Sequence, residues 1–158
     1  MTGARTTRVS RVVGASRRAV YSAWLDARAL AAWLPPSGMR GDVQGLDARE
    51  GGGYRMTLTY ERAEHPVPGK TSEHTDAVRA RFVQLIPDER IVQAVRFDAS
   101  DPDLAGKMTM SVTLADADEG TDVTVLCERI PRGIRLEDNE MGCRSSLENL
   151  AAFLERAP

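Results

Sequence analysis

Length, composition and charge exclude several classes of protein. The chain has 158 residues, of which 42% are hydrophobic and 28% are charged, and its net charge is -2. This size and composition predict a single soluble domain over residues 1–158. Nucleic acid is not expected as a partner, because the charge includes no basic block. No membrane span and no signal peptide are seen, so we predict a cytoplasmic protein.

Lysine and cysteine usage indicate the source and the redox compartment. Lys70 and Lys107 are the only lysines among the 21 basic residues, a skew that indicates a GC-rich coding sequence and a bacterial protein. Cys127 and Cys143 form no CxxC pair and have no metal-ligand spacing, so we predict two reduced thiols.

The N-terminal part of the chain predicts a strand followed by two short helices. Residues 5–14 alternate loosely and contain three valines, which is typical of a strand. Ser16 is a good N-cap for the first helix, and Asp26 is one for a second helix that ends at Trp33. The doublet Pro35-Pro36 then predicts a turn, because proline ends a helix.

Strands dominate the middle of the chain. The strictest alternation follows the three glycines at 51–53, which predict a hinge or bulge. Residues 62–74 and 98–106 are polar and predict loops or turns. Six strands are expected in this part, over residues 39–48, 54–61, 76–86, 91–98, 107–114 and 121–130.

Residues 137–156 predict a long amphipathic helix, with apolar residues at helical spacing at Cys143, Leu147, Leu150 and Leu154. Consecutive strands joined by short turns imply an antiparallel sheet, and one apolar face of that sheet must be covered. The long helix is the element that can cover it. We therefore predict an α+β helix-grip fold: a curved antiparallel sheet of about seven strands around the C-terminal helix, with two short helices after the first strand closing one end.

Several motifs, in this order and spacing, support a family resemblance. They are Ala15 to Pro36, Gly51-Gly52-Gly53-Tyr54, Ile86 to Val92, Gly120 to Thr124, and Asn139, Gly142, Leu147 and Leu150. Together they cover essentially the whole chain and resemble the SRPBCC superfamily of START-type and birch-pollen-allergen-like domains. Within it, the chain is most similar to homologues of the C-terminal domain of the heat-shock-protein-90 ATPase activator.

One position departs from the pattern of this subgroup. Gly142 is usually followed there by tryptophan, whereas Cys143 follows it here. The change from an indole to a thiol removes volume from the core. Because protein interiors pack densely, we expect Phe153 or Met141 to fill the gap, and an enlarged cavity is the alternative.

The resemblance implies an internal cavity, and the favoured function is binding of a small hydrophobic molecule between the sheet and the long helix. Methionines suit an adaptable apolar pocket, although core packing is the competing interpretation for any one of them. Trp33 is expected to contact the ligand, and Trp24 is expected to be structural. The predicted ligand-binding residues are Trp33, Tyr54, Met56, Leu58, Tyr60, Phe82, Phe97, Met108, Met110, Cys143, Leu147 and Leu150.

Two other functions stay open. The same resemblance implies a regulator of a chaperone ATPase, with the chaperone as its partner. An enzyme similar to a polyketide cyclase would need a buried acid or base, for which Glu128, Arg96 and Gln93 are candidates. The sequence leaves open which of these side chains point into the cavity, because the strand at 91–98 has apolar residues on both of its faces. No catalytic motif is visible, so no catalytic residue is assigned, and a homodimer also stays open.

No metal or cofactor is predicted. His65 and His74 lie among acidic residues, but their separation of nine residues fits no known pattern of metal ligands. A dyad of one histidine with Cys127 or Cys143 is also disfavoured, since a buried free cysteine usually behaves as a small hydrophobe.

Overall fold

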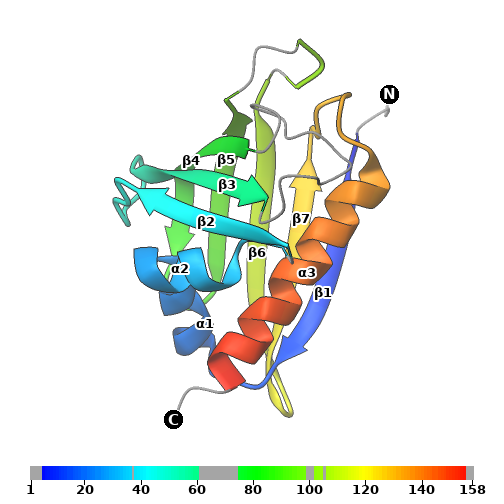
Figure 1. The fold of residues 1–158 in the computed structure, drawn as a ribbon. Helices are drawn as coiled ribbons and strands as arrows, with labels where there is room; N and C mark the ends of the chain where they lie inside the picture. The colour runs from blue at the N-terminus through cyan, green and yellow to red at the C-terminus, as the bar shows by residue number, and fades with distance from the viewer. Residues whose placement is uncertain (1–4, 37, 61–74, 99–101, 105, 156–158) are drawn as a thin grey trace.

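The computed structural model describes residues 5–36, 38–60, 75–98, 102–104 and 106–155. The strands within these residues are β1 (Thr7–Val13), β2 (Met39–Gln44), β3 (Gly53–Tyr60), β4 (Thr75–Ile86), β5 (Arg90–Phe97), β6 (Met108–Ala117) and β7 (Gly120–Glu128). The helices are α1 (Arg17–Trp24), α2 (Ala27–Trp33), the 3₁₀ helix η1 (Pro102–Leu104) and α3 (Leu136–Glu155), and Figure 1 shows their arrangement.

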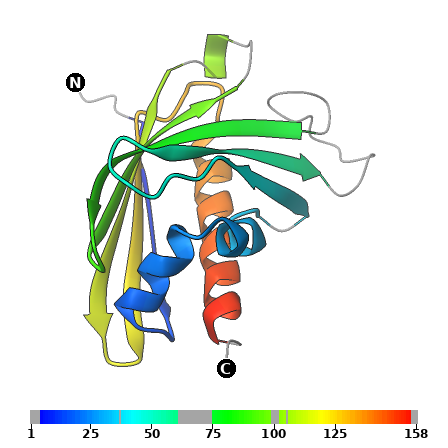
Figure 2. The same ribbon diagram turned by 90° about the vertical axis from the view of Figure 1, so that its left-hand side faces the viewer.

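The described strands form one antiparallel sheet in the order β1-β7-β6-β5-β4-β3-β2. Consecutive strands from β2 to β7 are neighbours, and β1 pairs with β7 at the far edge. The sheet curls strongly, and all three α-helices lie on its concave side (Figure 2). This arrangement confirms the predicted α+β helix-grip fold.

Local capping signals set the start of both short helices, as predicted. The Ser16 side chain accepts a hydrogen bond from the backbone N–H of Ala19 at 3.1 Å. The Asp26 carboxylate accepts one from the backbone N–H of Ala29 at 3.0 Å. α1 contacts β6 and β7, whereas α2 lies between β2 and α3, so the pair closes one end of the curled sheet.

The long helix α3 packs along β1 and shares the buried core with the sheet. Side chains at the start of the chain hold α3 and the segment that leads into it. The Thr7 hydroxyl donates to Asn139 Oδ1, and the Arg5 guanidinium donates to the backbone carbonyls of Ile130 and Ile134. No helix in the described part of the chain is long and apolar enough to cross a membrane.

Two predicted connections need comment. The segment 98–106, predicted as a polar turn, contains η1 and buries Leu104 in the core. The physical reason is docking of η1 on a distant segment, because the backbone N–H of Gly133 donates to the carbonyl of Asp103 at 2.8 Å. The predicted loop at 62–74, with His65 and His74, lies outside the described residues.

Candidate functional site

The concave side of the sheet encloses a cavity of about 470 Å³. This volume lies in the usual range of small-molecule sites, about 300–1,000 Å³. Helices α1 and α3, strands β3 to β6, η1 and the turn after α2 all contribute to the wall. The lining residues are Trp24, Leu34, Pro36, Tyr54, Met56, Leu58, Val78, Ala80, Gln93, Val95, Phe97, Leu104, Met108, Met110, Gly133, Ile134, Arg135, Asp138, Asn139, Gly142 and Ser146.

Strand pairing assembles the sheet side of the wall. Every second residue of a strand points to the same face, so Tyr54 and Met56 of β3 both face the cavity. Their partners in β4 are Ala80 and Val78, which also line the cavity. Directly opposed side chains touch across a pair of strands, so the register produces a continuous apolar surface.

The face that α3 turns to the cavity is small and polar. Asn139, Gly142 and Ser146 line the wall at spacings of three and four residues, which places them on one side of a helix. The neighbouring apolar stripe, with Leu147 and Leu150, is buried in the core instead. The most hydrophobic face of α3 therefore stabilises the fold, and the face beside it borders the cavity.

Two polar side chains of α3 anchor the turn that follows α2. Ser146 Oγ donates to the carbonyl of Leu34 at 2.5 Å, and Asn149 Nδ2 donates to the carbonyl of Pro35 at 2.9 Å. These bonds fix Leu34 and Pro36 on the cavity wall. Sequence reasoning missed both anchors, because a serine and an asparagine on a helix usually face water.

The structure reverses the expected placement of the two tryptophans. Trp33 is 0% exposed and does not line the cavity, and its indole Nε1 donates to the carbonyl of Ala23 at 3.1 Å. Its ring packs edge-on against Trp24, with centroids 4.5 Å apart. Trp33 thus lies behind Trp24, and Trp24 is the tryptophan on the wall.

The other predicted ligand-binding residues divide into two groups. Phe82, Leu147 and Leu150 are buried in the core and do not line the cavity, and Cys143 lies against Cys127. The Tyr60 side chain lies outside the described residues. The members that the structure places on the wall are Tyr54, Met56, Leu58, Phe97, Met108 and Met110.

A buried polar pair lies on this mainly apolar wall. The Tyr54 hydroxyl donates to Gln93 Oε1 at 3.1 Å. Burial raises the pKa of Tyr54 well above its ordinary value, so the phenol stays protonated and remains a donor. The register of β5 turns Gln93 inward between buried Ile91 and Val95, which settles a facing that the sequence left open.

The other polar candidates lie elsewhere. Glu128 and Arg96 are exposed and do not line the cavity, so neither is the buried acid or base that an enzyme would need. Asp138 is the carboxylate among the described residues of the lining, and it is in an exposed position. The described residues contain no group of three side chains that could hold a metal ion.

The two cysteines meet beside the cavity, which their separation in the sequence did not indicate. Their Sγ atoms are 3.9 Å apart, and Cys143 Sγ is 4.0 Å from Asn139 Oδ1. The hydrogen bond with Cys127, together with burial, raises the pKa of the Cys143 thiol. Both residues are free thiols.

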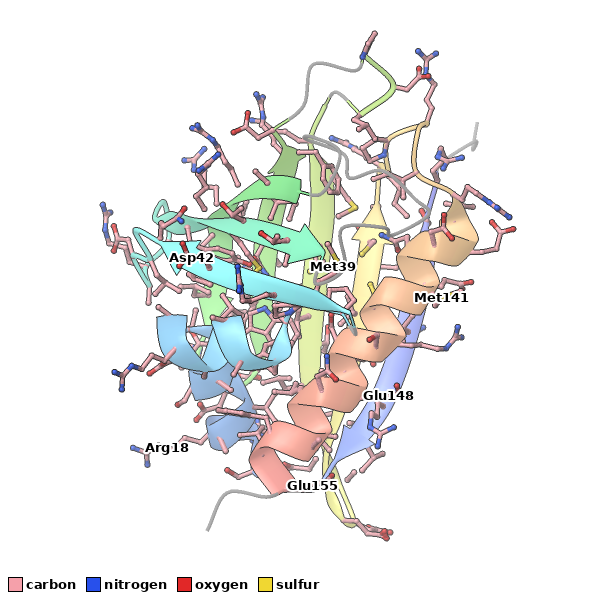
Figure 3. All side chains as sticks on the ribbon, viewed as in Figure 1. Arg18, Met39, Asp42, Met141, Glu148 and Glu155 are labelled. Carbon is pink, nitrogen blue, oxygen red and sulfur yellow. The ribbon has the colours of Figure 1, made fainter. Side chains whose placement is uncertain are left out.

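The volume that a tryptophan at position 143 would occupy is not filled by Met141. Met141 is 65% exposed and is labelled on α3 in Figure 3, so the expectation that it fills the gap is wrong. A Cβ added to Gly142 would meet no atom of another element within 4 Å. The helix here borders open cavity space.

The chain is similar to several proteins of solved structure. A protein from Chromobacterium violaceum is 38% identical, with 97% of this chain and 99% of that chain covered and a TM-score of 0.85. A protein from Rhizobium loti is 25% identical, with 95% and 96% covered and a TM-score of 0.71. An AHSA1-like protein from Aeromonas hydrophila shares the fold at 16% identity, with 95% and 92% covered and a TM-score of 0.69.

A comparison with curated proteins finds none that matches. The model of one protein family, described as activator of Hsp90 ATPase homolog 1-like protein, matches residues 14–155. That match spans the two short helices, the strands from β2 to β7 and the long helix, and so includes the elements that build the cavity. The chain therefore belongs to the AHSA1-like family, within the SRPBCC superfamily.

Proposed function

We propose that this protein binds a small hydrophobic molecule in the cavity between the sheet and α3. The observation that supports this function is the wall itself, on which Met56, Met108 and Met110 gather with Tyr54 and Phe97 around about 470 Å³. Burial of apolar ligand surface would drive binding, at about 25 cal/mol per Å². Methionine side chains adapt to ligands of different shape, so the site suits a family of related molecules.

A pair of methionine variants tests this function. Met110 lines the cavity, whereas Met141 is exposed on α3 and does not line it. Tryptophan at position 110 would occupy ligand space, so we expect M110W to weaken binding of the neutral fluorescent probe N-phenylnaphthylamine about tenfold or more. M141W is the matched control and should bind as the unmodified protein does.

The measurement is a fluorescence titration at constant protein concentration, with the melting temperature of each variant recorded alongside. Equal weakening by M110W and M141W would contradict the proposal, because the loss would then not come from the cavity. Failure of the unmodified protein to bind the probe or any of a panel of hydrophobic ligands would also contradict it.

A second candidate function is regulation of a chaperone ATPase, which the description of the matching family supports. Such a regulator would act through its outer surface and would not need a filled cavity. Addition of the protein to the Hsp90-type chaperone of the same organism should then raise its ATPase rate, and M110W should raise it equally. No change in the ATPase rate would contradict this candidate.

A further inference from the structure

Within the described part of the chain, two buried hydrogen-bond donors on the cavity wall have no partner. Gln93 is 1% exposed, and its Nε2 has no hydrogen-bond acceptor among the described residues. Trp24 is 2% exposed, and its indole Nε1 also has none within the described part of the chain. Both residues line the same cavity, one from β5 and the other from α1. Buried donors are normally paired, so each of them calls for an acceptor.

The Tyr54–Gln93 pair offers a donor whichever way the amide is turned. With Oε1 toward Tyr54, the phenol donates to it at 3.1 Å and Nε2 is free. With the amide turned over, Nε2 donates to the phenol oxygen and the hydroxyl hydrogen is free. The indole N–H of Trp24 is a donor only. In both orientations this wall therefore has a donor that lacks an acceptor.

The charged groups of the wall indicate what kind of acceptor fits. Among the described residues, Arg135 and Asp138 are the charged ones that line the cavity, and both are in exposed positions. The Arg135 guanidinium is also paired with Glu137 at 3.4 Å. A ligand carboxylate beside Gln93 would be buried with no cation next to it among the described residues, which is strongly unfavourable. A ligand hydroxyl would bring a hydrogen that itself needs an acceptor, whereas a carbonyl oxygen only accepts.

We propose that the ligand is a neutral hydrophobic molecule with a carbonyl oxygen, as in a ketone, ester or amide, and that this oxygen accepts hydrogen bonds from Gln93 and Trp24. This inference rests on the proposed function and narrows it to a chemical class. Gln93 and Trp24 are then the residues that determine specificity, while the methionines provide apolar contact. A carbonyl oxygen has two lone pairs and is able to accept from both donors.

The test compares two probes of the same number of non-hydrogen atoms. The first probe is an acetylnaphthalene, and the second is the isopropylnaphthalene substituted at the same ring position. The second has a methyl group and a hydrogen where the first has its carbonyl oxygen. Their dissociation constants are measured by calorimetry or by displacement of N-phenylnaphthylamine. The variants are Q93M, which removes the amide, and W24F, which removes the indole N–H. M110L, on the same wall but without a hydrogen-bonding group, is the matched control.

We expect Q93M and W24F each to weaken binding of the ketone relative to the isopropyl compound, by about fivefold to tenfold. M110L should change the two affinities by the same factor. The use of two variants on separate elements keeps the test valid if one of them fails to fold.

A ratio of affinities that is unchanged in both variants would overturn the inference, since water would then satisfy the two donors. That outcome leaves the proposed function standing, because both probes still bind. If neither probe binds to the unmodified protein, the proposed function is overturned, and this inference with it.

Discussion

At the scale of single residues, Tyr54 links the cavity to the stability of the fold. It is buried, and its raised pKa means that the folded protein keeps the phenolic proton at pH values where the unfolded chain releases it. The folded state then binds more protons than the unfolded state, so the free energy of unfolding must fall as the pH rises. Below about pH 10 neither state loses this proton and the contribution is constant.

The variant Y54F isolates this effect. It removes the hydrogen bond to Gln93, so we expect it to be about 1 kcal/mol less stable than the unmodified protein at pH 7 to 9. Above about pH 10 the difference in free energy of unfolding between the two proteins should narrow, by up to about 1.4 kcal/mol per pH unit. The reason is that only the unmodified protein loses stability through titration of the Tyr54 phenol. Urea unfolding at a series of pH values measures the gap. A gap that stays constant to pH 11 would contradict the expectation.

The Cys127–Cys143 pair gives a second prediction at this scale. Cys127 is fully buried, and the pKa of Cys143 is raised by its hydrogen bond to Cys127 and by burial. The thiolate is the reactive form, so Cys143 should react with iodoacetamide at neutral pH at least tenfold more slowly in the folded protein than in urea. Mass spectrometry of timed samples measures this rate. Equal rates in the two states would show that the thiol is neither shielded nor raised in pKa.

At the scale of the elements, much of the fold could be predicted because its signals are local. Ser16 and Asp26 act on the backbone three residues away, and the alternation of β3 is complete within one strand. The facing of β5 was not predictable in this way, since apolar side chains occupy both registers. The pairing of β5 with its two neighbouring strands determines which side chains face inward, because Gln93 lies opposite Phe82 of β4 and Met110 of β6.

Two glycines on different elements give matched predictions of opposite sign. A Cβ on Gly53, at the start of β3, would lie 2.0 Å from the backbone oxygen of Ala80 in β4. The two strands would have to separate, so we expect G53A to lower the free energy of unfolding by about 2 kcal/mol or more. Gly142 lies inside α3 and borders open space, so G142A should raise it by about 0.5–1 kcal/mol.

Chemical denaturation with circular dichroism measures both glycine variants. Because both changes are from glycine to alanine, their effects on the unfolded chain are similar, and the difference between them reports on the folded state. Loss of stability in G142A comparable to that in G53A would mean that α3 packs more tightly against the cavity than the structure shows.

At the scale of the whole molecule, the cavity depends on contacts that no local pattern contains. Alternation predicted the methionines and tyrosine of β3 and β6, whereas Trp24, Leu104 and Ser146 reach the wall only through the docking of α1, η1 and α3. The curl of the sheet and the course of α3 along β1 decide which helix face meets the cavity. As a result, Leu147 and Leu150 lie in the core and Gly142 lies on the cavity wall.

Because the wall is assembled from elements throughout the fold, a bound ligand should stabilise the whole molecule and not one end of it. At a free acetylnaphthalene concentration of 100 times its dissociation constant, we expect about 2.7 kcal/mol of added stability. Amides that exchange only through global unfolding, which we expect in the central strands β5 and β6, should then exchange about 100-fold more slowly. Hydrogen exchange followed by mass spectrometry measures this, with α1 and α3 as further reporters. Protection confined to α1 and α2 would show that the probe binds only at the closed end, and would contradict a site formed jointly by the sheet and α3.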